Sequence, residues 1–100
     1  MHAGPELNVG DSEPVELTED FEAFHARERA SALAFAAALT GDWAIAEDLT
    51  QEAFAAAHVQ WRKLHSPSHW VRRVIANKSA SRWRRLSRET RALTRLAARS

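Results

Sequence analysis

Glycine and proline, the residues that most often interrupt regular backbone, occur only once each after residue 17, as Gly41 and Pro67. The three segments before, between and after these two positions carry apolar residues at helical spacing. No segment alternates apolar and polar residues as a half-buried strand would, and no internal repeat is present. The sequence therefore predicts an all-α fold, a small bundle of three to four main helices.

The first helix is expected over residues 19–39. Thr18 is suited to cap this helix, and Glu19 and Asp20 would lie in its first turn, where carboxylates stabilise the positive end of the helix dipole. Gly41 is suited to end it, because glycine tolerates the left-handed conformation. The apolar residues that share one face are Phe21, Phe24, Phe35 and Leu39.

The second helix is expected over residues 43–61, with Asp42 as its cap. The residues predicted to form its apolar side are Ile45, Ala46, Leu49, Ala53, Ala57 and Trp61. This helix should end before "RKLHSPSH", residues 62–69, because Pro67 lacks an N–H donor and disfavours helical geometry at Ser66.

The last helix is expected from about residue 68 to 86, or on to Ser100, with Ser66 or Ser68 as its cap. Its predicted inner side consists of Trp70, Val71, Val74, Ile75, Ser79 and Trp83. We expect three regions: a disordered acidic tail over 1–17, a helical domain over 18–86, and a basic linker beginning over 87–100.

The predicted core is thin, because much of the 45% hydrophobic content is alanine. Its large members are Phe21, Phe24, Leu33, Phe35, Leu39, Ile45, Leu49, Phe54, Val59, Trp61, Trp70, Val74, Ile75 and Trp83. The chain has no cysteine, which excludes disulfides and thiolate zinc sites and fits a reducing cytosol. No run of about 18 apolar residues and no signal pattern is present, so we expect a cytoplasmic protein without membrane insertion.

The net charge of +1 conceals a strong asymmetry between the two parts of the chain. Residues 1–60 hold two basic and twelve acidic residues, 2 − 12 = −10, whereas residues 61–100 hold twelve basic residues and one acid, 12 − 1 = +11. This asymmetry indicates two different partners, one for each part. The alternative is an internal dipole in which the two parts neutralise each other, although short helices bury few charges against one another.

Acidic and amide side chains gather opposite the apolar side of the second helix. Glu47 and Gln51 are adjacent on the helix surface, as are Asp48 and Glu52, because each pair is spaced i, i+4. A solvated face would interleave lysine or arginine, but neither occurs between Arg29 and Arg62. We therefore interpret Glu47, Asp48, Gln51 and Glu52 as a binding face.

The last helix carries a basic stripe suited to nucleic acid, since arginine binds phosphate oxygens and releases condensed counterions. The stripe comprises Arg73, Asn77, Ser81, Arg84 and Arg88, flanked by Arg72 and Arg85. The preceding loop adds Arg62, Lys63, His65 and His69 beside Trp61 and Trp70. These tryptophans could stack on an unpaired base, but core packing is the favoured interpretation in so alanine-rich a domain. For Arg91–Arg99 a plain solvated tail is the alternative.

An enzyme is not expected, because the sequence has no glycine-rich phosphate loop, nucleophile elbow or paired catalytic carboxylates. His65 and His69 have the i, i+4 spacing of zinc ligands on a helix, but Pro67 between them breaks that geometry. We expect no catalytic residue, metal or cofactor.

Four blocks together resemble region 2 of bacterial sigma factors of the extracytoplasmic-function group. They are "FEAFHARER", "GDWAIAEDLTQEAF", "WRKL" and "SPSHWVRRVIANKSASRWRR", and the resemblance covers about residues 19–86. The sequence departs from the family pattern at Trp43, where proline is common, and at Ser81, where aspartate is common. The resemblance implies a transcription initiation factor, with residues 87–100 beginning the linker toward a region 4 domain.

The resemblance also implies the roles of the two charged surfaces. Asp48, Gln51 and Glu52 match the positions that dock on the β′ clamp coiled coil of RNA polymerase core, and Glu47 lies beside them. The 62–69 loop and the last helix would bind the promoter −10 element, capture a flipped non-template base and help open the duplex. Arg73, Asn77 and Arg84 match polar positions of that helix.

A second class of function is a helical interaction domain whose charged faces contact only proteins. An anti-sigma factor that covers both surfaces is the expected partner of that kind. DNA binding by the isolated domain would distinguish the two classes, because nucleic-acid binding through arginines falls steeply with salt.

Overall fold

The computed structural model describes residues 19–100, so the predicted tail over 1–17 lies outside the described residues. It contains the helices α3 (Phe21–Thr40), α4 (Trp43–Val59) and α5 (Pro67–Arg99), with a short 3₁₀ helix, η2 (Trp61–Lys63), between the last two. Within this range the chain forms helices and turns but no strand, which confirms the predicted all-α class. None of the described helices is both long and apolar enough to cross a membrane.

Side chains at the helix ends explain where α3 and α4 begin. The carboxylate of Asp20 accepts a hydrogen bond from the Ala23 N–H at 2.8 Å, and that of Asp42 accepts one from the Ile45 N–H at 3.0 Å. Asp42 is the predicted cap. The prediction of Thr18 for α3 was wrong, because Asp20, in an extended conformation, takes the capping position and starts the helix two residues later.

The turn between α3 and α4 follows the sequence prediction. Gly41 has φ 69°, and its N–H donates to the Ala37 carbonyl at 2.8 Å, which closes the last turn of α3. An L-amino acid with a side chain is disfavoured in this left-handed conformation, so glycine is suited to the position.

The second break differs in detail from the prediction. α4 ends at Val59 rather than residue 61, and Trp61 belongs to η2. Pro67 is the first residue of α5, where its missing N–H costs no helical hydrogen bond. Ser66 occupies the capping position but its side chain makes no capping hydrogen bond. The longer of the two predicted ends of α5 is the correct one, since the helix continues to Arg99.

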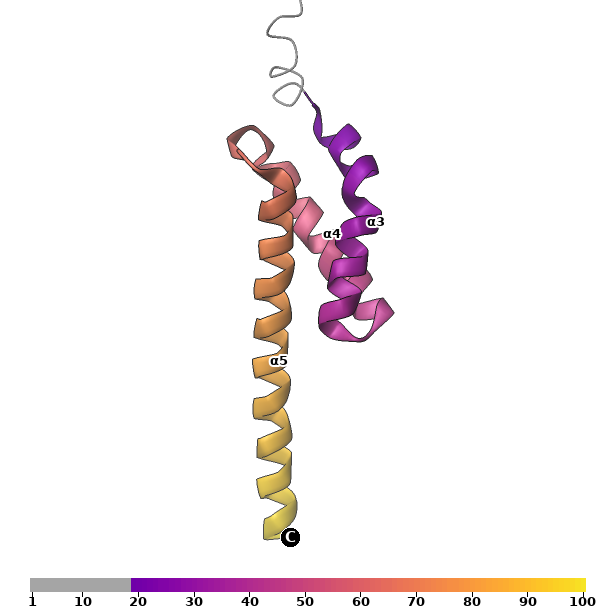
Figure 1. Cartoon of the computed structure of the whole chain (residues 1–100). Coiled ribbons are helices and arrows are strands. Elements are labelled where there is room, and N and C mark those ends of the chain that lie inside the picture. Colours follow the sequence, from indigo (N-terminus) through magenta and orange to yellow (C-terminus); the bar gives the residue numbers. More distant parts are fainter. Residues whose placement is uncertain (1–18) are drawn as a thin grey trace, which may run out of the picture.

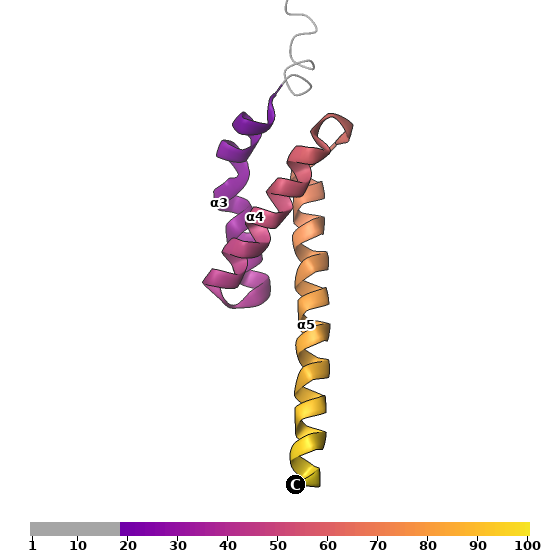
Figure 2. The same cartoon turned by 180° about the vertical axis from the view of Figure 1, so that it is seen from behind.

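The three helices pack pairwise against one another around a core of few large side chains (Figures 1 and 2). The large members are Phe24, Leu33, Phe54, Val71 and Ile75. Five alanines complete the core: Ala32, Ala36, Ala46, Ala53 and Ala57. Small side chains at helix contacts allow close approach of the helix axes, so the alanines contribute directly to the packing of the core.

Three predicted core residues are exposed, and these predictions were wrong. Leu39 is 46% exposed beside the Gly41 turn, Val59 is 86% exposed at the end of α4, and Trp83 is 71% exposed on α5. Figures 1 and 2 both show α5 continuing as a lone helix past α3 and α4. Trp83 therefore lies on the side predicted to be internal but has no neighbouring helix to cover it.

Candidate functional site

The four residues of the acidic face, Glu47, Asp48, Gln51 and Glu52, are all exposed on α4. Buried residues separate them along the chain, because Leu49, Thr50 and Ala53 turn inward. The packing of α4 against the other two helices thus fixes which side of the helix carries the acids. This matches the division into apolar and acidic sides that the helical spacing predicted.

A single ion pair connects the acidic face to α5 among the described residues. Lys78 Nζ lies 3.2 Å from Glu52 Oε1, and the two side chains are 42% and 56% exposed, respectively. Exposed pairs of this kind contribute little to stability. Glu47, Asp48 and Gln51 have no ion-pair or hydrogen-bonding side-chain partner within the described part of the chain.

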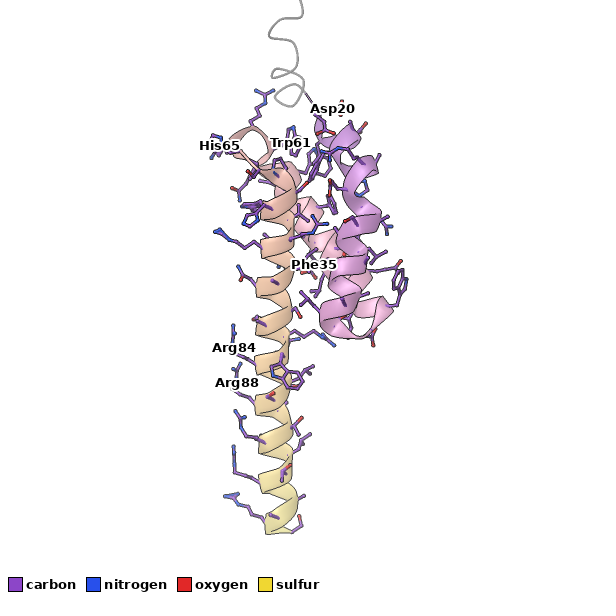
Figure 3. The ribbon with its side chains drawn as sticks, viewed as in Figure 1. Asp20, Phe35, Trp61, His65, Arg84 and Arg88 are labelled. Carbon is purple, nitrogen blue, oxygen red and sulfur yellow. The ribbon has the colours of Figure 1, made fainter. Side chains whose placement is uncertain are left out.

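The basic stripe lies along the exposed side of α5. Arg73, Asn77, Ser81, Arg84 and Arg88 are all exposed, as is the flanking Arg85. Figure 3 shows Arg84 and Arg88 projecting from the same side of α5, away from α3 and α4. The two charged surfaces are consequently separate, apart from the Lys78–Glu52 pair.

The loop before α5 places further polar side chains at one end of the bundle (Figure 3). Arg62, Lys63, His65 and His69 are exposed. An open depression of about 690 Å³ lies between this loop and the start of α3. Its lining includes Glu19, Arg27, Trp61, Arg62, His65 and His69. A depression with charged, imidazole and aromatic groups at its rim can hold a polar planar group.

The structure favours the core interpretation for both tryptophans of this region. Trp61 is half-buried, and its ring centroid lies 5.7 Å from that of Phe21 and 5.0 Å from that of Phe24. Trp70 is also half-buried and packs against the core. Trp61 nevertheless also lines the depression.

Arg72 differs from the other basic residues that the sequence singled out, because it contacts α3. Its Nη2 donates to Ser31 Oγ, and its Nη1 lies 3.7 Å from Glu28 Oε1. Its guanidinium carbon lies 5.8 Å from the centroid of the Phe35 ring. The side chain is 33% exposed, so Arg72 helps to join α5 to α3. Helical spacing alone placed it beside the stripe but gave no sign of these contacts.

Two histidines that the interpretation of the two charged surfaces did not use lie over the aromatic end of the core. His58 stacks on Phe21 with ring centroids 4.5 Å apart, and His25 meets Phe54 edge-on at 4.7 Å. The spacings Phe21–His25 and Phe54–His58, each i, i+4, were the available sequence signal. No group of three or more potential metal-ligating side chains occurs among residues 19–100.

The sequence model of one protein family, described as Sigma-70 region 2, matches residues 24–89. The match spans 66 of the 100 residues and includes the acidic face, the loop and the whole basic stripe from Arg72 to Arg88. No curated protein and no solved structure matches the chain.

Proposed function

Because this chain belongs to the sigma-70 region 2 family, we propose that its two charged surfaces bind different partners. The family is non-enzymatic and acts in transcription initiation with RNA polymerase at promoters. The acidic face docks on RNA polymerase core, and the basic stripe with the preceding loop binds the promoter −10 element. The observation that carries this proposal is the separation of the two surfaces on α4 and α5, with one weak ion pair between the acidic face and Lys78 of α5.

Docking through the acidic face is supported by the accessibility of all four side chains and by the scarcity of nearby cations. Uncompensated acids on one helix repel each other, and a basic partner surface would relieve that repulsion. The partner surface is the β′ clamp coiled coil, with Asp48, Gln51 and Glu52 as principal contacts and Glu47 beside them.

Binding of the −10 element is supported by the exposed groups on α5 and the loop. Arg73, Asn77, Ser81, Arg84 and Arg85 contact the backbone and base edges. Arg62 and His65 line the depression that receives a flipped base, and Lys63 follows Arg62 in η2. Arg72 acts differently from these residues. It positions α5 against α3, because its guanidinium already contacts Ser31 and Glu28.

We also assign the chain to the extracytoplasmic-function group, on the strength of "AEDLTQEAF" and the spacing of Pro67, Trp70, Arg73, Asn77, Arg84 and Arg85. Its place of action is the cytoplasm, with polymerase and promoter DNA.

A second candidate function is a protein-interaction module covered by an anti-sigma factor. The observation that favours it is a set of exposed apolar side chains on α5: Trp83, Leu86, Leu93 and Leu96. Exposed apolar groups of this number on one helix are typical of protein contacts.

Capture of polymerase core by the immobilised chain, followed by addition of a labelled single strand with a −10-like sequence, tests both halves. We expect core to be retained and the strand to bind in a salt-sensitive manner. Retention of core without any strand binding would favour the protein-interaction module, and failure to retain core would contradict the docking proposal.

A further inference from the structure

The basic stripe does not stop where the family match stops. The match ends at residue 89, whereas α5 continues to Arg99 and adds Arg91, Arg95 and Arg99. Eleven residues make about three helical turns, so side chains eleven apart lie on one line along the helix. Arg73, Arg84 and Arg95 form one such line, and Asn77, Arg88 and Arg99 form another. The chain thus repeats its stripe pattern beyond the family domain.

The three added arginines are fully available to a ligand. Each is exposed, and none has an ion pair or hydrogen-bonding side-chain partner within residues 19–100. The one acid of this segment, Glu89, lies on a different side of the helix, because position 89 falls about 120° from Arg95 at roughly 100° per residue. In Figures 1 and 2 this part of α5 projects beyond α3 and α4.

We propose that Arg91, Arg95 and Arg99 are a second nucleic-acid contact, which binds the phosphates of the duplex that flanks the melted element. This inference rests on the proposed function, since it extends the same surface. Guanidinium groups bind phosphates without reading bases, so the contact is independent of DNA sequence.

Beyond Trp83 the described part of α5 carries no aromatic side chain, whereas Trp61 lines the depression beside the loop before α5, and this difference favours duplex over single strand for the distal arginines. Single-strand binding depends on aromatic rings on which bases stack, whereas duplex backbones are bound by arginine and lysine alone. Trp83, the nearest exposed ring, lies about 100° around the helix from Arg84. It therefore faces away from the stripe.

The length of the stripe also fits a duplex. Arg73 and Arg95 are separated by 22 positions, or about 33 Å along a helix, which is close to one turn of B-DNA. A straight helix cannot follow one groove over that length. The distal arginines therefore reach a stretch of backbone separate from the one contacted by Arg73 and Arg84.

Binding should also stabilise this part of α5. Beyond residue 87 every residue of α5 is exposed, so no tertiary contact supports the helix there, and short unsupported helices are marginal in water. Arg91, Arg95 and Arg99 are spaced i, i+4 and repel one another. Phosphates would remove that repulsion, so the helical circular dichroism signal should rise on duplex binding.

The experiment compares two fluorescent probes: a single strand with a −10-like sequence, and the same strand joined to a duplex flank of about 20 base pairs, roughly two turns. We expect the full chain to bind the flanked probe more tightly and with a steeper salt dependence. In the variant Arg91→Gln, Arg95→Gln, Arg99→Gln this advantage should vanish. The slope of log K against log salt should become shallower by about 0.9 for each phosphate that is no longer neutralised, with single-strand binding unchanged.

A charge-matched control distinguishes the effect of the position of these arginines from the effect of net charge. Adding Thr90→Arg, Leu93→Arg and Ala97→Arg to the triple variant restores the charge at exposed positions on the other side of the helix. We expect no recovery, and recovery would overturn the inference.

Other results have distinct meanings. Equal binding of both probes by the unmodified chain would overturn this inference and leave the −10 proposal standing. Binding of neither probe by the folded chain would overturn both. If the triple variant bound the flanked probe normally but no longer bound polymerase core, the arginines would belong to a protein interface and the inference would be wrong.

Discussion

Lys78 Nζ on α5 lies 3.2 Å from Glu52 Oε1 on α4, and this pair is the one ion-pair link between the acidic face and α5 in the part of the chain that the structure describes. Both groups are accessible to water, so the pair contributes at most about 1 kcal/mol. The two surfaces are therefore not neutralised by each other. Substitutions on one surface should leave the other intact.

Charge reversal on the acidic face should abolish polymerase binding without unfolding the domain. We expect Asp48→Lys with Glu52→Lys to prevent capture of polymerase core, because lysines would face a basic partner. Both sites are exposed, so the free energy of unfolding should change by only about 0.5 kcal/mol. Pull-down and circular dichroism measure the two effects, and a decrease in helix content would mean that the acids are structural.

Two variants serve as controls for this reversal. Glu22→Lys with Glu89→Lys reverses the same number of exposed acids elsewhere and should retain polymerase. Glu52→Lys with Lys78→Glu restores an ion pair in the opposite sense but leaves a lysine on the acidic face. This swapped variant should recover stability and still bind polymerase poorly. Full recovery of binding would show that Glu52 acts through Lys78 alone.

Removal of the stripe should weaken nucleic-acid binding. We expect Arg73→Gln, Asn77→Ala and Arg84→Gln together to reduce affinity for a −10-like single strand and to make its salt dependence shallower, because fewer phosphates are neutralised. Anisotropy titrations at several salt concentrations measure both changes. Unchanged affinity and slope would favour the protein-interaction module.

Arg72 and Arg73 are neighbours in sequence but should respond differently to substitution. Arg72→Ala removes the interactions with Ser31, Glu28 and Phe35, and we expect the unfolding free energy to fall by about 1–2 kcal/mol. Arg73→Ala should cost less than about 0.5 kcal/mol, because its side chain is exposed. Urea denaturation measures both variants, and equal midpoints would contradict a structural role for Arg72.

The α3–α4 turn offers a test of backbone conformation without steric interference. A Cβ built on Gly41 meets no atom within 4 Å, so the cost of Gly41→Ala arises from φ 69° alone. We expect about 1–2 kcal/mol for alanine and less for Gly41→Asn, since asparagine tolerates this region better. Thermal unfolding compares the two variants. A similar destabilisation in both would point to a cause other than the backbone angle.

The positions of the helices followed from the sequence because their signals are local. Asp42 and Gly41 fix one turn by their own hydrogen bonds and backbone angle, and Pro67 fixes the start of α5. Packing between helices left no such signal. Periodicity indicated which side of α5 faces inward but not what length of that helix α3 and α4 cover. It also gave no sign that Arg72 contacts Ser31.

Helical periodicity assigned two residues of α5 to the same inner side, but only one of them is covered by other helices. Substituting both residues tests this difference. Ile75 is fully buried, and Ile75→Ala should cost about 2–5 kcal/mol, because it leaves a cavity between three helices. Trp83 is 71% exposed, so Trp83→Ala should change the unfolding free energy by less than about 1 kcal/mol despite the larger side chain removed. Urea denaturation of both variants measures the difference. A large destabilisation by Trp83→Ala in the isolated chain would mean that another surface covers this ring in solution, contrary to the lone-helix arrangement.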